Sequence, residues 1–249
     1  MEKSHRVIGL AVLALAAVLS TWIAASTWQR VKTWRANTID VTGSAKRRIS
    51  SDLIVWEASI ATRAPDRQTA YRELRTGVEK TLAYLEEHGI TESEISVQSV
   101  ETEAVVDKEV TGIGAERIEK TIPSGFKTSQ IIRVTGSRVA EIERVSREVT
   151  ELIDADVPVV SSPPRYLYTK LGDLKIEMLA EASKDARTRA ERILASAGNA
   201  GVGKLRKADM GVINVNPANS TDTSWDGNND TSSFDKDIVT IVHCTFDME

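Results

Sequence analysis

The chain has 249 residues and a formal net charge of −4, and 27% of its residues are charged. This balance argues against nucleic-acid binding as the main function, because neutralising phosphates requires a basic surface. The single cysteine, Cys244, excludes an intrachain disulfide and any metal site built from several cysteines.

Residues 7–25 contain no charged side chain. As a helix rising ~1.5 Å per residue, they would extend ~28 Å, about the thickness of the hydrocarbon core of a bilayer. Basic residues flank both ends, and Trp22, Trp28 and Trp34 lie near the second end, where indole rings favour the lipid headgroups. We therefore expect residues 1–36 to be an N-terminal anchor and linker, with a transmembrane helix over about 7–25.

A cleaved secretory signal is the alternative for this segment. Ala24-Ala25-Ser26 offers small residues for cleavage, but the apolar run exceeds the usual length of ~7–15 residues. Basic residues lie on both sides and slightly favour a cytoplasmic C-terminal side, but charge alone leaves the membrane orientation open. The remaining residues, 37–249, are numerous enough to bury a hydrophobic core.

The pattern over residues 38–64 predicts two strands joined by a tight turn at Ser50-Ser51. Gly43, inside the first of them, indicates a bulge or a close approach of another backbone. Asp66 is predicted to cap a helix whose apolar residues recur every three or four positions, and Gly89 follows its end.

Residues 95–110 and 126–135 alternate between apolar and polar side chains and predict a hairpin with a long polar connection. A second helix is predicted over 139–152, with Ser137 as its cap. A strand region over 157–170 follows, interrupted by Pro163-Pro164. This order of elements predicts an α+β fold in which helices pack on antiparallel sheets.

The longest predicted helix begins with Asp173 as its cap. Its predicted buried stripe is rich in alanine, which allows close approach to a partner, and consists of Ile176, Leu179, Ala180, Ser183, Ala186, Ala190, Ile193, Leu194 and Ala197. Strands are predicted over 204–215 and 237–246. Between them lies a loop rich in serine, threonine, asparagine and aspartate, over about 217–235, which we expect to be mobile.

Several of these segments resemble one known family. The motifs are Tyr166-Leu-Tyr168 before the long helix, Lys184-Asp185-Ala186-Arg187 within it, Gly203-Lys204 after it, and Asp40-Val-Thr-Gly43-Ser44 near the start, which looks like an N-terminal hairpin. The chain resembles the SIMPL-domain family, also called periplasmic immunogenic protein or YggE-like, over roughly residues 38–247. It departs from the family at Ser44-Ala45, where many members have a second glycine, and in its longer loop.

The resemblance implies two α+β subdomains, a membrane tether or signal, and homo-oligomeric rings or cages outside the cytoplasm; some members are associated with oxidative-stress protection. We therefore expect an envelope protein anchored in the inner membrane with a periplasmic C-terminal domain and a non-catalytic structural or interaction role. A ligand-binding envelope module is one alternative. An envelope hydrolase with carboxylates that we cannot place is another.

Candidate catalytic groups are sparse. His5, His88 and His243 lie in three different contexts, and only His243 adjoins the cysteine. Neighbouring residues of a strand point to opposite faces, so His243 cannot activate Cys244, which we expect to be a packed thiol. Gly112-Ile-Gly114 is too short to be a phosphate-binding loop and does not open a helix.

Some oxygen-bearing residues follow known spacings. Asp226, Asn228 and Asp230 match the first three ligands of a calcium loop, but Thr231 stands where glycine is required and Asp237 where a bidentate glutamate is required. A solvated loop is therefore favoured.

The remaining candidates are two pairs of carboxylates and a pair of aromatic residues. We place Glu86 and Glu87 on a helix face and Glu101 and Glu103 on the solvent side of a strand. Tyr166 and Tyr168 could stack on a ligand, but packing is favoured. We predict no catalytic, cofactor-binding or metal-binding residue, and no cofactor.

Overall fold

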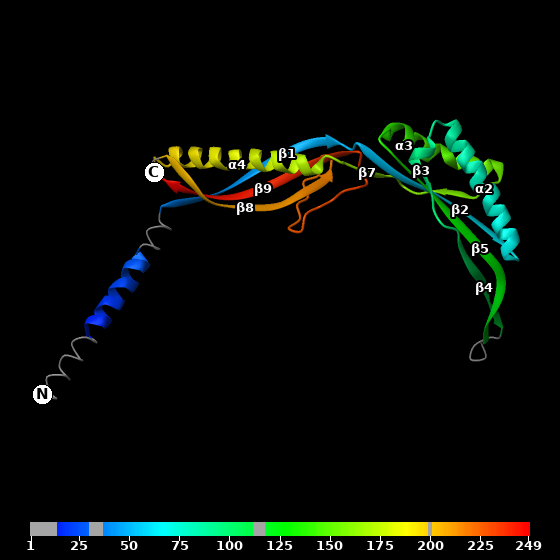
Figure 1. The fold of residues 1–249 in the computed structure, drawn as a ribbon, viewed down its shortest axis with the longest axis horizontal. Helices are drawn as coiled ribbons and strands as arrows, with labels where there is room; N and C mark the ends of the chain where they lie inside the picture. Colours follow the sequence, from blue (N-terminus) through cyan, green and yellow to red (C-terminus); the bar gives the residue numbers. More distant parts are fainter. Residues whose placement is uncertain (1–13, 30–36, 112–117, 199–200) are drawn as a thin grey trace, which may run out of the picture. The chain divides into compact units, whose positions relative to one another are not determined.

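The computed structural model describes residues 14–29, 37–111, 118–198 and 201–249. It has an α+β fold with antiparallel pairing and several helices (Figure 1). In chain order the elements are β1 (Thr38–Ser50), β2 (Leu53–Ala64), α2 (Arg67–Glu87), η1 (Glu92–Glu94), β3 (Ile95–Val97), β4 (Glu101–Thr111), β5 (Ile118–Gly136), α3 (Val139–Glu148), η3 (Val149–Ala155), β6 (Val159–Ser161), β7 (Arg165–Leu167), α4 (Leu171–Ser196), β8 (Val202–Pro217) and β9 (Asp235–Met248).

Residues 14–29 near the N-terminus are helical. Among the residues that the structure describes, no helix is both long enough and apolar enough to cross a membrane. The predicted span 7–25 begins outside the described residues. The transmembrane helix therefore stays a prediction.

The chain divides into two compact units. The first unit comprises Met1–Lys46, Lys175–Ile213 and Val239–Glu249, and the second comprises Arg47–Leu174 and Asn214–Ile238. Each unit is therefore assembled from segments that are far apart in the sequence.

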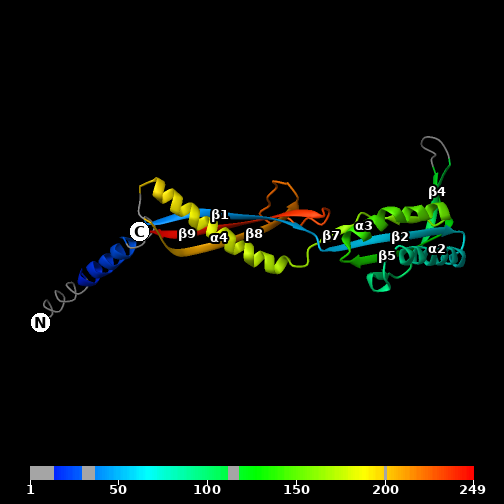
Figure 2. The ribbon, with the colours of Figure 1, turned by 90° about the horizontal axis from the view of Figure 1, so that it is seen from above.

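The first unit is built on a three-stranded sheet with the order β1-β9-β8 (Figures 1 and 2). Helix α4 lies along this sheet, and its buried side chains recur every fourth residue: Leu174, Met178, Ala182, Ala186, Ala190 and Leu194. Four of the nine predicted positions of the stripe are therefore wrong, because Ile176, Ala180, Ile193 and Ala197 are exposed. The helix also begins at Leu171, which places Asp173 in its first turn instead of at its cap.

The second unit is built on a six-stranded sheet with the order β3-β5-β2-β6, in which β4 also pairs with β5 and β7 with β2. Strands β2 and β5 are antiparallel from Ile54 opposite Gly136 to Ala64 opposite Phe126. Alternate residues of β2 are buried against α2 and α3. The core includes Ile54, Trp56, Ala58, Ile60, Leu74, Leu85, Ile132, Val134, Ile142 and Val145.

The predicted pairing of the first two strands is wrong. β1 belongs to the sheet with β9 and β8, and β2 to the sheet with β5, β6 and β7. Between them, the amide of Ser51 donates to Phe234 O and the amide of Asp52 donates to Leu167 O. These bonds to other segments replace those of a hairpin turn.

Most other predicted elements are confirmed. Asp66 caps α2 by accepting a hydrogen bond from Thr69 N at 2.9 Å, and Gly89 has a positive φ of 84° after the helix end. β4 and β5 form the predicted hairpin, and strands β6 and β7 are separated at the two prolines. The predicted cap Ser137 is wrong, because Arg138 occupies the N-cap of α3 and makes no side-chain capping bond.

Candidate functional site

The loop between β8 and β9 is fixed to the end of β8 by two buried asparagines. Asn214 Oδ1 accepts from the amides of Ser224 and Asn228 at 3.0 and 3.1 Å, and Asn216 Nδ2 donates to Asp222 O at 2.6 Å. Mobility of residues 217–235 stays a prediction, but these bonds hold the loop at several points along its length.

A buried ion pair lies at the second end of this loop. Lys236, whose side chain is 2% exposed, donates to the backbone oxygen of Asp230 at 2.7 Å and to its carboxylate at 3.2 Å. The Asp230 carboxylate also accepts from Ser232 and Ser233. Burial raises the pKa of Asp230, but the hydrogen bonds from the two serines and from Lys236 outweigh burial and hold the pKa at about 2.

A second ion pair holds the first end of the loop. The Arg48 guanidinium donates to both carboxylate oxygens of buried Asp237, at 2.8 and 3.0 Å, and to Asn219 Oδ1 at 2.6 Å. The Asn219 amide also donates to Asp237. The hydrogen bond and charge of Asp237 raise the pKa of Arg48. Strand β1 and the loop are therefore joined by charge-assisted hydrogen bonds.

A hollow of about 300 Å³ opens between this loop, the end of β8 and the segment around β7. Its walls are mainly apolar, and its polar groups come chiefly from the loop and β9. The lining residues are Leu53, Tyr166, Leu167, Tyr168, Thr169, Leu171, Val215, Asn229, Asp230 and Lys236. The hollow is at the lower end of the range of ligand-binding cavities.

Tyr166, one of the two candidate aromatic residues, is a core residue. It is 9% exposed, packs edge-on against Phe234 with ring centroids 6.2 Å apart, and belongs to the hydrophobic core of the second unit. Burial, followed by the charge and hydrogen bond of Glu143, raises its pKa. The packing interpretation therefore holds for Tyr166, while Tyr168 borders the hollow and is half-buried.

The calcium-like spacing does not gather free ligands. The carboxylate of Asp230 accepts from serine and lysine donors, that of Asp237 is paired with Arg48, and the Asn228 side chain donates to Asn216 Oδ1 at 2.9 Å. Within the described ranges, no three His, Cys, Asp or Glu residues are grouped as a metal site would require.

The remaining candidates are dispersed. His243 is exposed and lies 2.9 Å from Thr42 Oγ1, whereas Cys244 is buried on the other face and its pKa is raised by this burial. His88 caps the end of α2. The candidate carboxylates are all exposed to solvent: Glu86, Glu87, Glu101 and Glu103. Three further candidates, His5, Gly112 and Gly114, lie outside the described residues.

The motif residues Gly43, Asp185 and Ala186 meet in the first unit. A Cβ atom on Gly43 would collide with Ala182 O and lie 2.5 Å from Ala186 N, so β1 and α4 touch through their backbones. Asp185 accepts from the amide of Ser44 at 2.8 Å, and this bond lowers its pKa. These motif residues therefore join a strand to a helix. The predicted close backbone approach at Gly43 is confirmed.

A model of the SIMPL family, described as "Protein of unknown function (DUF541)", matches residues 39–235. The chain belongs to the SIMPL family. No curated protein matches the chain. The family description names no activity.

Likeness to solved structures is low for this SIMPL protein. The match to the de novo designed protein Foldit4 has 13% sequence identity and a TM-score of 0.24. It covers 44% of this chain and 93% of the Foldit4 chain. The GlnK–ATP complex of B. subtilis is 14% identical, with a TM-score of 0.25, and covers 44% and 83%. The regulatory subunit of aspartate kinase from Thermus thermophilus is 13% identical, with a TM-score of 0.19, and covers 81% and 87%. Scores this low support no inference on function.

Strand β8 of this SIMPL domain has a long exposed segment. It lies at one end of the three-stranded sheet, next to β9, and its residues 204–212 are all exposed. Both faces of this segment therefore meet solvent, and so does the edge that β9 does not cover. Apolar side chains on it include Met210, which is 69% exposed, together with Leu205 and Val212.

Sequence reasoning missed the polar residues that build the loop site. Asn214, Asn216 and Lys236 lie within or beside predicted strands, and each is buried with a hydrogen-bond partner. The available signal was a polar residue in an alternating strand. That signal does not distinguish a buried, paired group from a solvent-facing one.

Proposed function

We propose that this SIMPL protein is a membrane-anchored, homo-oligomeric protein of the cell envelope that forms rings or cages and has a structural, non-catalytic role. A link to envelope or oxidative-stress protection belongs to the same proposal and comes from the resemblance to the family. One observation carries the assembly: the edge segment 204–212 of β8, which is exposed on both faces.

An exposed edge strand presents backbone amides and carbonyls that can pair with another strand. Natural proteins restrict such pairing by placing charges on the edge, and Lys204, Arg206 and Lys207 are positioned in this way. However, Arg206 is paired with Asp247 at 2.7 Å, and Lys207 is paired with Asp209. This pairing lowers the repulsion that a second copy would meet at the edge.

The anchoring part of the proposal is supported by the uncharged segment 7–25 and its basic flanks. Tethering confines copies of the chain to one surface, which raises their effective concentration for one another. This confinement adds to the pairing along β8 but is not required for it. The C-terminal domain would lie on the periplasmic side.

The test is the molar mass of the detergent-extracted full chain, measured by light scattering after size exclusion. We expect a defined oligomer, and we expect Leu205→Glu combined with Met210→Glu to lower its mass, because charges at these positions oppose pairing of the edge. Ile176→Glu is the matched control, since Ile176 is an apolar residue that is 71% exposed and belongs to α4 instead of β8. A monomeric full chain at all concentrations would contradict the proposal.

A further inference from the structure

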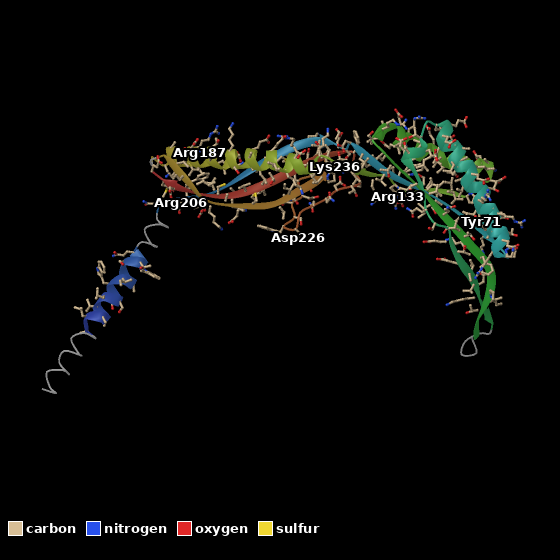
Figure 3. The ribbon with its side chains drawn as sticks, in the orientation of Figure 1. Tyr71, Arg133, Arg187, Arg206, Asp226 and Lys236 are labelled. Carbon is tan, nitrogen blue, oxygen red and sulfur yellow. The ribbon has the colours of Figure 1, made fainter. Side chains whose placement is uncertain are left out.

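The loop between β8 and β9 displays a tryptophan to solvent. Trp225 is 92% exposed. Its neighbours are nevertheless fixed, because the amide of Ser224 donates to buried Asn214 Oδ1 and the amide of Asp226 donates to Ser224 Oγ. In Figure 3, Asp226 marks this part of the loop, away from Lys236. A large indole is thus held outward by a hydrogen-bonded backbone.

Such a residue has the properties of an interface anchor. Tryptophan is enriched among the residues that dominate binding energy, and an indole can bury about 150–250 Å². Holding the loop in place before contact reduces the conformational entropy lost on binding. A binding partner for such an anchor needs a cavity that accepts an aromatic ring.

The same chain contains such a cavity. The hollow of about 300 Å³ has aliphatic walls from Leu53, Leu171 and Val215 and an aromatic wall from Tyr168. Thr169 and Asn229 are lining residues whose side chains contain oxygen, the kind of acceptor that a buried indole N–H needs. The size and the chemistry of the hollow both fit an indole.

The charges beside the two features are complementary. Asp226 follows Trp225 directly, and its side chain is exposed. Lys170 lies between the hollow residues Thr169 and Leu171, and it is also exposed. When an indole enters the hollow, its neighbouring carboxylate can approach this ammonium group. Complementary charges of this kind favour the correct partner and orientation.

We propose that Trp225 of one copy inserts into the hollow of the next copy. This inference rests on the proposed assembly and names one contact within it. Each copy carries both the indole and the hollow, so insertion that always runs from one copy to the next is a heterologous contact, and repeating it generates a ring when the rotation closes. Rings are the form of assembly that the proposed function includes.

The first test is Trp225→Ala in the full chain, with Tyr71→Ala as the matched control. Tyr71 is another exposed aromatic residue of the second unit, 49% exposed on α2 (Figure 3). We expect Trp225→Ala to weaken self-association by at least about 30-fold, as loss of a hot-spot residue does. Its melting temperature should equal that of the wild-type chain at dilutions where both chains are monomeric. Tyr71→Ala should assemble like the wild-type chain.

The second test is a cross-link between two variants. Trp225→Cys and Leu171→Cys chains are mixed under mild oxidation, and the linked peptides are identified by mass spectrometry. We expect a disulfide between positions 225 and 171 of different chains, and none when Tyr71→Cys replaces Trp225→Cys. The native Cys244 is buried and should not compete.

The outcomes separate this contact from the assembly itself. If the wild-type chain assembles and Trp225→Ala assembles equally well, the insertion is wrong and the proposed function stands. If the wild-type chain is monomeric, the proposed function and the insertion are both wrong.

Discussion

Gly43 allows β1 and α4 to touch, because its side chain is only a hydrogen atom. Gly43→Ala would place a methyl group against backbone atoms of Ala182 and Ala186. Backbone cannot move aside like a flexible side chain, so the helix must shift. Overpacking of this kind costs about 1–3 kcal/mol, and we expect the free energy of unfolding in urea to fall by at least that amount.

Gly172 supplies the control for this substitution. It lies in the first turn of α4, and no atom stands within 4 Å of a Cβ atom added there. Gly172→Ala should leave stability unchanged or raise it by up to about 1 kcal/mol, because alanine restricts the unfolded chain. Equal stability of the Gly43→Ala and wild-type chains would show that β1 and α4 are not in contact in solution.

The buried pair of Asp230 and Lys236 makes stability depend on pH. The pKa of Asp230 is about 2 in the folded chain against an ordinary value of 3.8. A carboxylate with a lowered pKa stabilises the fold above its unfolded pKa, and this contribution is lost as the pH falls through the folded pKa. We expect this group to contribute about 1 kcal/mol less at pH 3 than at pH 5, and about 2 kcal/mol less at pH 2.

Asp230→Asn isolates this contribution, because other carboxylates titrate alike in both chains. The difference in unfolding free energy between the wild-type and Asp230→Asn chains, measured in urea from pH 5 to pH 3, should shrink as the pH falls. A difference that stays constant over this range would mean that the carboxylate is not held ionised by Ser232, Ser233 and Lys236.

At the scale of elements, local signals predicted where most helices and strands occur. The N-cap of Asp66 and the repeat of apolar residues after it define α2, and the two prolines divide β6 from β7. These features act through the backbone within a few residues. The sequence of the segment alone is therefore enough to predict these features.

Pairing and burial could not be predicted in the same way. Alternation in β1 is compatible with any partner strand, and its true partner, β9, is nearly 200 residues away. In α4, hydrophobicity favoured Ile176 and Ile193, but alanines face β1 because only small side chains fit where the two backbones touch. Close packing, not side-chain hydrophobicity, selects the buried face there.

The loop site illustrates the same limit with polar residues. A segment rich in asparagine, serine and aspartate has the composition of a mobile loop. It is held by bonds to Asn214 and Asn216, whose burial depends on the loop folding back over them. Composition shows that polar groups are present, but it does not show that they form hydrogen bonds with one another.

At the scale of the whole molecule, anchoring and assembly depend on separate parts of the chain. The predicted anchor lies within residues 1–36, whereas the edge strand β8 and Trp225 lie far beyond it in sequence. Each property should therefore be removable without the other. This separation provides a test of the anchor that does not depend on the oligomer.

Leu15→Arg combined with Val18→Arg should abolish anchoring. Each arginine at the centre of a membrane helix costs about 2.5–3.5 kcal/mol on insertion scales, so the pair makes residues 7–25 a poor span. The wild-type chain should stay with the membrane fraction in alkaline carbonate, and the variant should be released. The variant should still form the wild-type oligomer, because β8 and the loop are unchanged. Release of the wild-type chain by carbonate would contradict an uncleaved anchor, and an N-terminus beginning after Ala25 would identify a cleaved signal instead.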